Sequence, residues 1–103
     1  LTSPTEARWG QALRFCATAL DPASGRQMQV WTTAPGVQFY TGGYLGGAGP
    51  GKGGAPIEAF SGFALETQTF PDSPNHPQFA QSRLDPGARY CHRMAFDFTP
   101  APA

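Results

Sequence analysis

Residues 62–70 combine a strand-like alternation with a carboxylate and a neighbouring amide. A period of two places Glu66 and Gln68 on one face, together with the small residues Gly62 and Ala64. This combination leaves room above a sheet for a polar ligand. A strand face that simply meets solvent would carry the same residues, and from the pattern alone this simpler interpretation is favoured.

A second polar pair lies on the short strand predicted for residues 37–41. Alternation puts Gln38 and Tyr40 on one face of that strand. If the two strands are neighbours, Gln38, Glu66 and Gln68 converge, and the ring of Tyr40 offers a ligand an apolar face. Nothing local in the sequence fixes that proximity.

The histidines and cysteines give weaker signals. His92 falls on the aromatic face of a predicted last strand, where a hydrogen-bonded core or boundary role is expected, and His76 lies among three prolines, where a hydrogen bond within the loop is expected. Two histidines so far apart, with no acidic or thiolate cluster, predict no metal site. Cys16 and Cys91 are too distant for a CxxC motif; two ordinary thiols are favoured, and a disulfide between them stays open.

A glycine-rich stretch imitates a phosphate-binding loop. Residues 46–52 fit the pattern G-x-x-x-x-G-K, but Gly53 stands where the motif needs the Ser or Thr that binds Mg²⁺. The following residues 54–56 cannot open the helix whose N-terminus would hold phosphate. A flexible surface loop over residues 42–56 is therefore predicted instead of a nucleotide site.

Alternation and turn residues predict an all-β chain. The turn at residues 21–25, with Pro22 and Gly25, makes residues 13–32 a hairpin. On its first strand Leu13, Phe15 and two alanines are expected to share a face. One helical turn is indicated near residues 6–13, and residues 99–103 are expected to form a frayed tail. The five predicted strands cover residues 13–20, 27–32, 37–41, 62–70 and 90–98.

Composition narrows the class of protein. The 103 residues suffice for one small domain, and 13 Gly and 11 Pro with 40% hydrophobic residues fit short strands joined by turns. The formal net charge is zero and the basic residues are scattered, which argues against a nucleic-acid partner. No apolar run is long enough to span a membrane, and the first residues do not resemble a signal peptide, so a cytoplasmic location is the expectation.

Several of these segments together are similar to the aldose 1-epimerase family. The matching stretches are residues 31–42 (WTTAPGVQFYTG), 62–68 (GFALETQ) and 70–77 (FPDSPNHP), followed by the 86–87 turn and the 90–98 strand. Their order follows the family's C-terminal region. The resemblance implies that residues 1–103 are one partial domain from an antiparallel β-sandwich.

The resemblance also implies an isomerase that interconverts the α and β anomers of free hexoses such as galactose and glucose. In this family the glutamate of Leu-Glu-Thr-Gln is the general base, which corresponds to Glu66, and the glutamine corresponding to Gln38 contacts sugar hydroxyls. No cofactor is implied, because no redox or group transfer occurs. The family's acid histidine lies in its N-terminal part, which is the implied partner of this chain. Neither His76 nor His92 aligns with it, so the chain alone is expected to be inactive.

The chain departs from the family pattern at two places. Gly43 and Tyr44 stand where the family often has Asn-Phe, and Ala34 stands where it often has an acidic residue. Both departures bear on the edge of the sugar cleft. Two alternatives stay open: a non-catalytic carbohydrate-binding module, in which Gln38, Tyr40 and Gln68 grip a sugar, and a structural β module without a ligand.

Overall fold

The computed structural model describes residues 5–8 and 10–101. They form two compact units, one of residues up to 36 and from 67 onward, the other of residues 37–66. Within the described residues the helical segments are three single 3-10 turns, η1 (Leu45–Gly47), η2 (Lys52–Gly54) and η3 (Ser73–Asn75). The expected all-β, antiparallel fold is confirmed. None of the described helices is long or apolar enough to cross a membrane.

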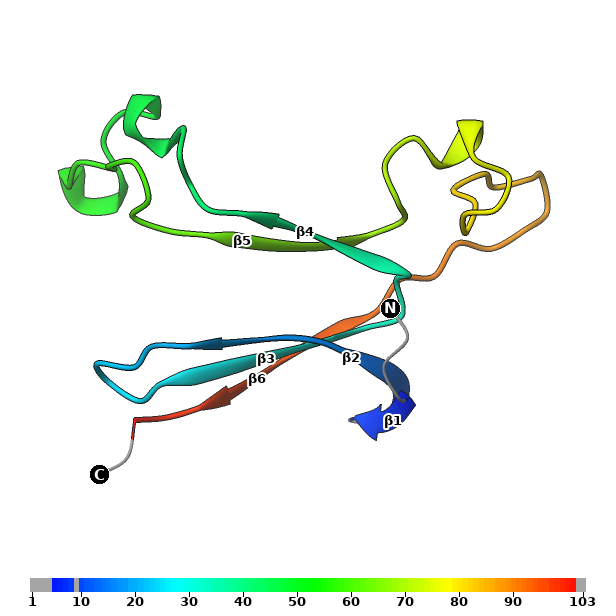
Figure 1. The fold of residues 1–103 in the computed structure, drawn as a ribbon, viewed down its shortest axis with the longest axis horizontal. Coiled ribbons are helices and arrows are strands. Elements are labelled where there is room, and N and C mark those ends of the chain that lie inside the picture. The colour runs from blue at the N-terminus through cyan, green and yellow to red at the C-terminus, as the bar shows by residue number, and fades with distance from the viewer. Residues whose placement is uncertain (1–4, 9, 102–103) are drawn as a thin grey trace. The chain divides into compact units, whose positions relative to one another are not determined.

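The first unit contains a four-stranded antiparallel sheet in the order β1-β2-β3-β6 (Figure 1). Three successive residues of β3, Val30, Trp31 and Thr32, are buried, so the second half of this strand is covered on both faces. The predicted hairpin is confirmed, because β2 and β3 pair directly. The strands are β1 (Thr5–Arg8), β2 (Gln11–Leu20), β3 (Gln27–Thr32) and β6 (Met94–Thr99).

A β-bulge in β2 contradicts the face that the sequence predicts. Phe15 pairs with Trp31 and Ala17 with Val30, so Cys16 is an extra residue without a partner on β3. Since Trp31 and Val30 are adjacent on β3, Phe15 and Ala17 lie on opposite faces of the sheet. The prediction that Leu13, Phe15 and the two alanines share a face was therefore wrong beyond Phe15. Burial raises the pKa of the Cys16 thiol.

The helical turn indicated near residues 6–13 was also wrong. Residues 5–8 form β1, which pairs with β2 through a tight connection that contains Gly10 at a φ of 75°. A lone helical turn fixes several residues for one hydrogen bond, whereas pairing with β2 gives partners to the backbone groups along the whole inner edge of β1. At the other end, β6 begins four residues later than predicted and runs through Thr99, the first residue of the predicted tail.

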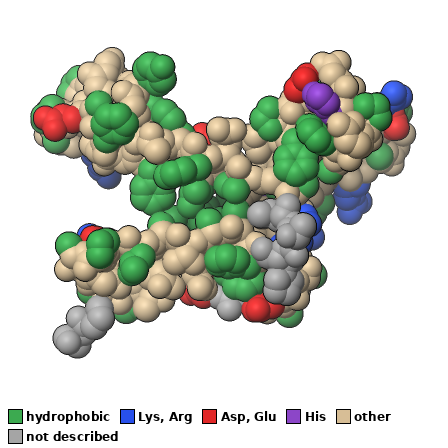
Figure 2. All heavy atoms as spheres, viewed as in Figure 1, with side chains coloured by type: hydrophobic (Ala, Val, Ile, Leu, Met, Phe, Trp, Pro, Cys, Tyr) green, Lys and Arg blue, Asp and Glu red, His purple; other side chains and the backbone are tan. Residues whose placement is uncertain are grey.

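The second sheet consists of β4 (Gly36–Tyr40) and β5 (Ala64–Gln68). These are the two strands on which the sequence places the polar pairs. The connection between them is the predicted glycine-rich loop, closed by a bridge between Pro50 and Pro56. Many large apolar side chains remain exposed on the surface (Figure 2), among them Phe39, Phe63 and Phe98.

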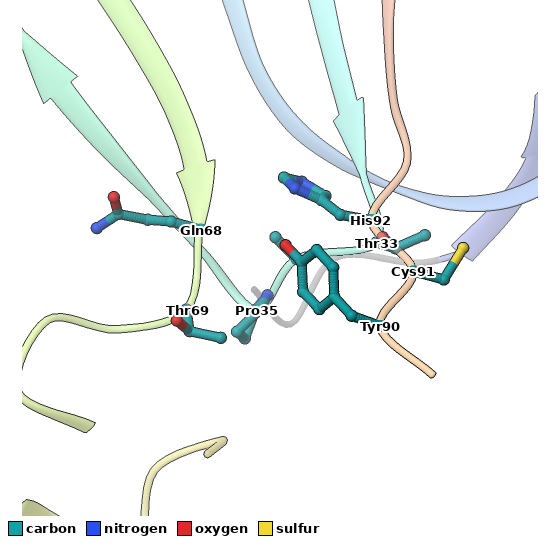
Figure 3. A pocket seen from close by; sticks show the side chains of 8 residues that line it. Thr33, Pro35, Gln68, Thr69, Tyr90, Cys91 and His92 are labelled. Carbon is teal, nitrogen blue, oxygen red and sulfur yellow. The ribbon is translucent and has the colours of Figure 1, made fainter. Parts of the chain in front are cut away.

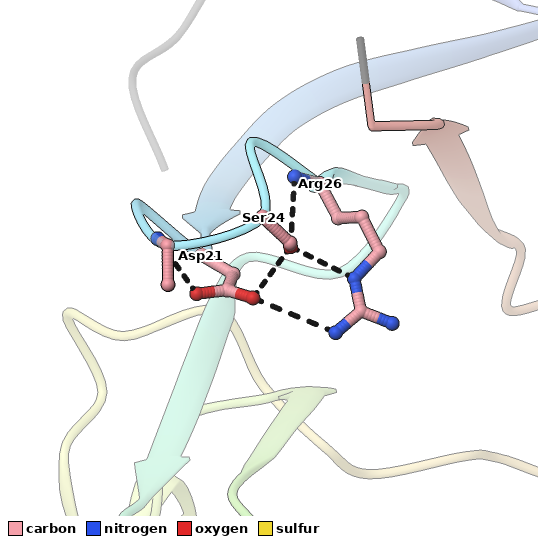
Figure 4. Close-up of polar contacts among 4 residues, drawn as sticks. Asp21, Ser24 and Arg26 are labelled. Carbon is pink, nitrogen blue, oxygen red and sulfur yellow. Dashed lines mark hydrogen bonds and ion pairs between the residues drawn. The ribbon is translucent and has the colours of Figure 1, made fainter. Parts of the chain in front are cut away.

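The β2–β3 turn is built around the carboxylate of Asp21 (Figure 4). Its Oδ1 accepts the N–H of Ala23 at 3.1 Å, and its Oδ2 accepts the hydroxyl of Ser24 at 2.5 Å and the guanidinium of Arg26 at 3.5 Å. The Ser24 bond, followed by the Ala23 N–H and Arg26, lowers the pKa of Asp21 below its ordinary value of 3.8. Gly25 closes the turn at a φ of 73°.

Because the pKa of Asp21 is lowered, we expect the effect of Asp21→Asn on the stability of the protein to depend on pH. A carboxylate whose pKa falls on folding stabilises the protein above its ordinary value of 3.8 and loses that contribution as the pH falls further. We expect Asp21→Asn to unfold at lower urea than the parent at pH 7, with the difference shrinking towards pH 2.5. Urea unfolding across this range measures it. Glu58→Gln, at an exposed loop position, is the control, and a difference for Asp21→Asn that stays constant with pH would contradict the assignment.

Candidate functional site

Glu66 lies in the middle of β5 with its side chain exposed. Among the described residues its carboxylate has no hydrogen-bond or ion-pair partner, so it is available to a ligand. The next residue, Thr67, is buried, as the alternation of a strand requires when one face is covered and the other open. The predicted polar face of this strand therefore includes an accessible carboxylate.

Gln38 shares that face with Glu66. The rings of Phe39 and Phe63 meet edge to face with their centroids 6.3 Å apart, so these two side chains lie on one side of the β4–β5 ribbon. Because side chains alternate along each strand, Gln38 and Glu66 both lie on the other side. Gln38 is exposed as well. The convergence that the sequence leaves open is supported for these two residues.

Two close backbone approaches set the alignment of β4 against β5. A Cβ on Gly36 would lie 3.5 Å from the carbonyl oxygen of Gln68, and a Cβ on Gly42 would lie 2.2 Å from that of Gly62. The N–H of Phe60 also donates to the Gly42 carbonyl at 2.9 Å. An antiparallel alignment that keeps both approaches places Gln38 directly opposite Glu66, where cross-strand side chains are neighbours.

The other two candidates of the polar faces have different surroundings. The hydroxyl of Tyr40 accepts the backbone N–H of Tyr44 at 2.9 Å, which ties the end of β4 to the loop that follows it. Gln68 lines a pocket of ≈ 170 Å³ in the first unit (Figure 3). Figure 3 shows Tyr90 and His92 projecting to one side of their segment and Cys91 to the other. The remaining lining residues are Thr33, Ala34, Pro35 and Thr69.

Both histidines have the structural contacts that the sequence predicts. His92 is half-buried, and its Nε2 lies 2.9 Å from Thr67 Oγ1. His76 Nε2 lies 3.0 Å from Asp72 Oδ2, and its ring stacks on Phe79 with centroids 4.8 Å apart. Within the described residues no three His, Cys, Asp or Glu side chains are grouped so that they could hold a metal ion. Cys16 and Cys91 are both free thiols.

Sequence reasoning missed the residues that hold the bend between β3 and β4. The guanidinium of Arg14, on β2, donates to the carbonyls of Thr33 and Ala34 at 3.3 and 3.1 Å. The hydroxyl of Thr32 accepts the N–H of Ala34 at 3.0 Å. These contacts satisfy backbone groups where the chain leaves the buried strand and enters the one that carries Gln38. Arg14 is the one charged residue of β2, and this was the available signal.

Comparison with known proteins shows the family of this chain. The family model described as aldose 1-epimerase matches residues 5–97. The chain belongs to the aldose 1-epimerase family. It is 51% identical to galactose mutarotase from Mus musculus over 88 residues and 51% identical to that from Homo sapiens over 87 residues. It is 45% identical to aldose 1-epimerase from Escherichia coli K12 over 74 residues.

These matches cover most of this chain but a minor part of each relative. They take in 85% of the chain and 26% of the mouse protein, 84% and 25% for the human protein, and 70% and 21% for the bacterial one. The chain therefore spans about a quarter of the length of the mammalian relatives it matches.

One departure from the family pattern has little steric consequence. A Cβ on Gly43, where the family often has Asn, would lie 3.5 Å from the ring of Phe60, an ordinary contact. The adjacent Tyr44 is almost fully exposed. The exchange therefore leaves the closely packed backbone at Gly42 undisturbed.

Gly42 is the position where a methyl group should disturb the site. Gly42→Ala combines a φ of 83° with a contact of 2.2 Å to the Gly62 carbonyl, so β4 and β5 cannot keep their alignment. We expect a loss of about 1–3 kcal/mol in the free energy of unfolding. Gly47→Ala is the matched control, since its Cβ meets nothing within 4 Å. Urea unfolding compares them, and equal stabilities would refute the proposed alignment.

Proposed function

We propose that this chain contributes the general base and one sugar contact of an aldose 1-epimerase that interconverts the α and β anomers of a free hexose such as galactose or glucose. The observation that carries the proposal is the exposed carboxylate of Glu66 on the same open face as Gln38. Membership of the aldose 1-epimerase family and the names of the relatives, galactose mutarotase and aldose 1-epimerase, support it.

The chemistry requires a proton acceptor at the anomeric hydroxyl. Glu66 removes the proton from the C1 hydroxyl while an acid protonates the ring oxygen, so that the C1–O5 bond breaks and an aldehyde forms. Rotation about C1–C2 presents the other face of the aldehyde. The ring oxygen then attacks C1, the acid recovers its proton, and Glu66 returns a proton to the new C1 hydroxyl. Atoms balance without an added reactant.

Gln38 contributes binding in this scheme. Its amide carries two donors and an acceptor, which match the paired donor and acceptor character of sugar hydroxyls. Its position opposite Glu66 lets it hold the hydroxyls of a pyranose whose C1 faces the carboxylate. β4 and β5 form one two-stranded sheet, which fixes the position of Gln38 relative to Glu66.

The acid is the part that this chain does not supply. His92 and His76 have the partners Thr67 and Asp72, and neither histidine lies on β4 or β5. The family resemblance assigns the acid to a histidine in the N-terminal part. A base without its acid loses both positioning and proton transfer, so the 103-residue chain alone is expected to accelerate mutarotation very little.

A hybrid protein tests the role of Glu66. In it, residues 5–97 of this chain replace the corresponding segment of mouse galactose mutarotase. We expect the hybrid to catalyse mutarotation of α-D-galactose, measured by polarimetry, and Glu66→Gln to lower kcat by about 10²- to 10⁴-fold, because the amide cannot accept the proton.

Glu58→Gln is the matched control, since it makes the same chemical change at an exposed loop residue, and it should leave kcat unchanged. Full activity in the Glu66→Gln hybrid would remove Glu66 from the mechanism. A folded hybrid with no activity, under conditions where the mouse protein is active, would contradict the proposed function as a whole.

Gln38→Ala tests the sugar contact in the same hybrid. Loss of hydrogen bonds made equally in the ground and transition states raises KM and leaves kcat largely unchanged. We expect KM for galactose to rise about tenfold, which corresponds to roughly 1.4 kcal/mol. Gln78→Ala, at an exposed loop position, should leave KM unaltered. An unchanged KM in Gln38→Ala would show that this amide does not hold the substrate.

A further inference from the structure

Hydrogen bonds among two buried threonines and the half-buried His92 join three distant parts of the chain, one of which is the residue after the proposed base. His92 Nε2 lies 2.9 Å from Thr67 Oγ1 and 3.4 Å from Thr32 Oγ1. Thr67 is 7% exposed and Thr32 is fully buried. All three residues belong to the first unit. Buried hydroxyls of this kind need partners, and here the imidazole provides one.

The hydrogens of this junction can be counted. The Thr32 hydroxyl accepts the Ala34 N–H and has one proton, which the Arg93 carbonyl can accept at 3.4 Å. Because the Thr32 hydroxyl already has these two partners, the main hydrogen bond of His92 is the shorter one, to Thr67 at 2.9 Å. If Nε2 carries a proton the imidazole donates to Thr67, and if Nε2 is bare the Thr67 hydroxyl donates to it. The bond persists in either tautomer and in the protonated ring.

Thr67 is bonded directly to Glu66, and the two side chains lie on opposite faces of β5. Glu66 itself has no side-chain partner among the described residues, so its direction depends on how firmly its backbone is held. A shift of about 1 Å in a catalytic group can cost 100-fold in rate.

We propose that His92 is a positioning residue, which holds the carboxylate of Glu66 in place through its hydrogen bond to Thr67. This inference rests on the proposed function, because it concerns the same base. His92 touches neither substrate nor reacting atoms. It acts on kcat by fixing the strand from its buried side.

The test uses Thr67→Val in the hybrid, which keeps the side-chain shape and removes the hydroxyl. We expect kcat to fall about 10- to 100-fold with KM changed less than twofold, and Thr67→Ser to restore most of kcat. Thr18→Val, on an exposed face of β2, is the matched control and should leave kcat unchanged. In a Glu66→Gln background, Thr67→Val should lower kcat no further, since the group that it positions is gone.

The outcomes separate the two proposals. Retained activity in Glu66→Gln alone refutes the proposed function. A large loss in Glu66→Gln with unchanged kcat in Thr67→Val overturns the positioning role, and so does an equal loss from Thr67→Val in both backgrounds. If urea unfolding shows that Thr67→Val does not fold, His92→Gln and His92→Leu replace it. The amide should retain kcat and the leucine should lose it, and equal kcat values for the two would overturn the inference.

Discussion

The bend after β3 depends on hydrogen bonds to the polar groups of its buried C-terminal end, because the chain leaves the sheet there. Thr32 ends β3 with a buried hydroxyl that accepts the Ala34 N–H. Arg14 reaches from the neighbouring strand to the next two carbonyls. A buried amide or hydroxyl left unpaired costs about 1–3 kcal/mol, so these contacts determine the path of the bend. That path leads into β4 and its Gln38.

Strand positions and turns were predictable because they rest on local chemistry. Pro22 and Gly25 mark the β2–β3 turn, and alternation in residues 62–70 separates a polar from an apolar side. The bulge at Cys16 was not predictable, since nothing in the segment shows that Trp31 will pair with Phe15 instead of its neighbour. Register is set by both strands together, and a single inserted residue reverses every face beyond it.

In the candidate site, too, the features set within one strand could be predicted from the sequence, whereas contacts between distant residues could not. The sequence gives the residue types of Glu66 and Gln38, and the period of two in a strand gives the faces on which they lie. Their position opposite each other depends on Gly42 meeting the Gly62 carbonyl, a contact that the two glycines permit and the sequence alone does not indicate. The bond between Thr67 and His92 joins residues 25 positions apart, and only the folded chain brings them together.

A strand suits this kind of site because adjacent residues face opposite ways. Glu66 can stay open to a ligand while Thr67, one bond along the chain, is buried and hydrogen-bonded. A carboxylate with packed neighbours of its own would be held as firmly, but those neighbours would fill the space in front of it that the proposed sugar substrate requires. Anchoring the backbone from the covered side avoids that conflict. The small residue Ala64 lies on the same open face two positions before the carboxylate, and it leaves space beside the proposed base.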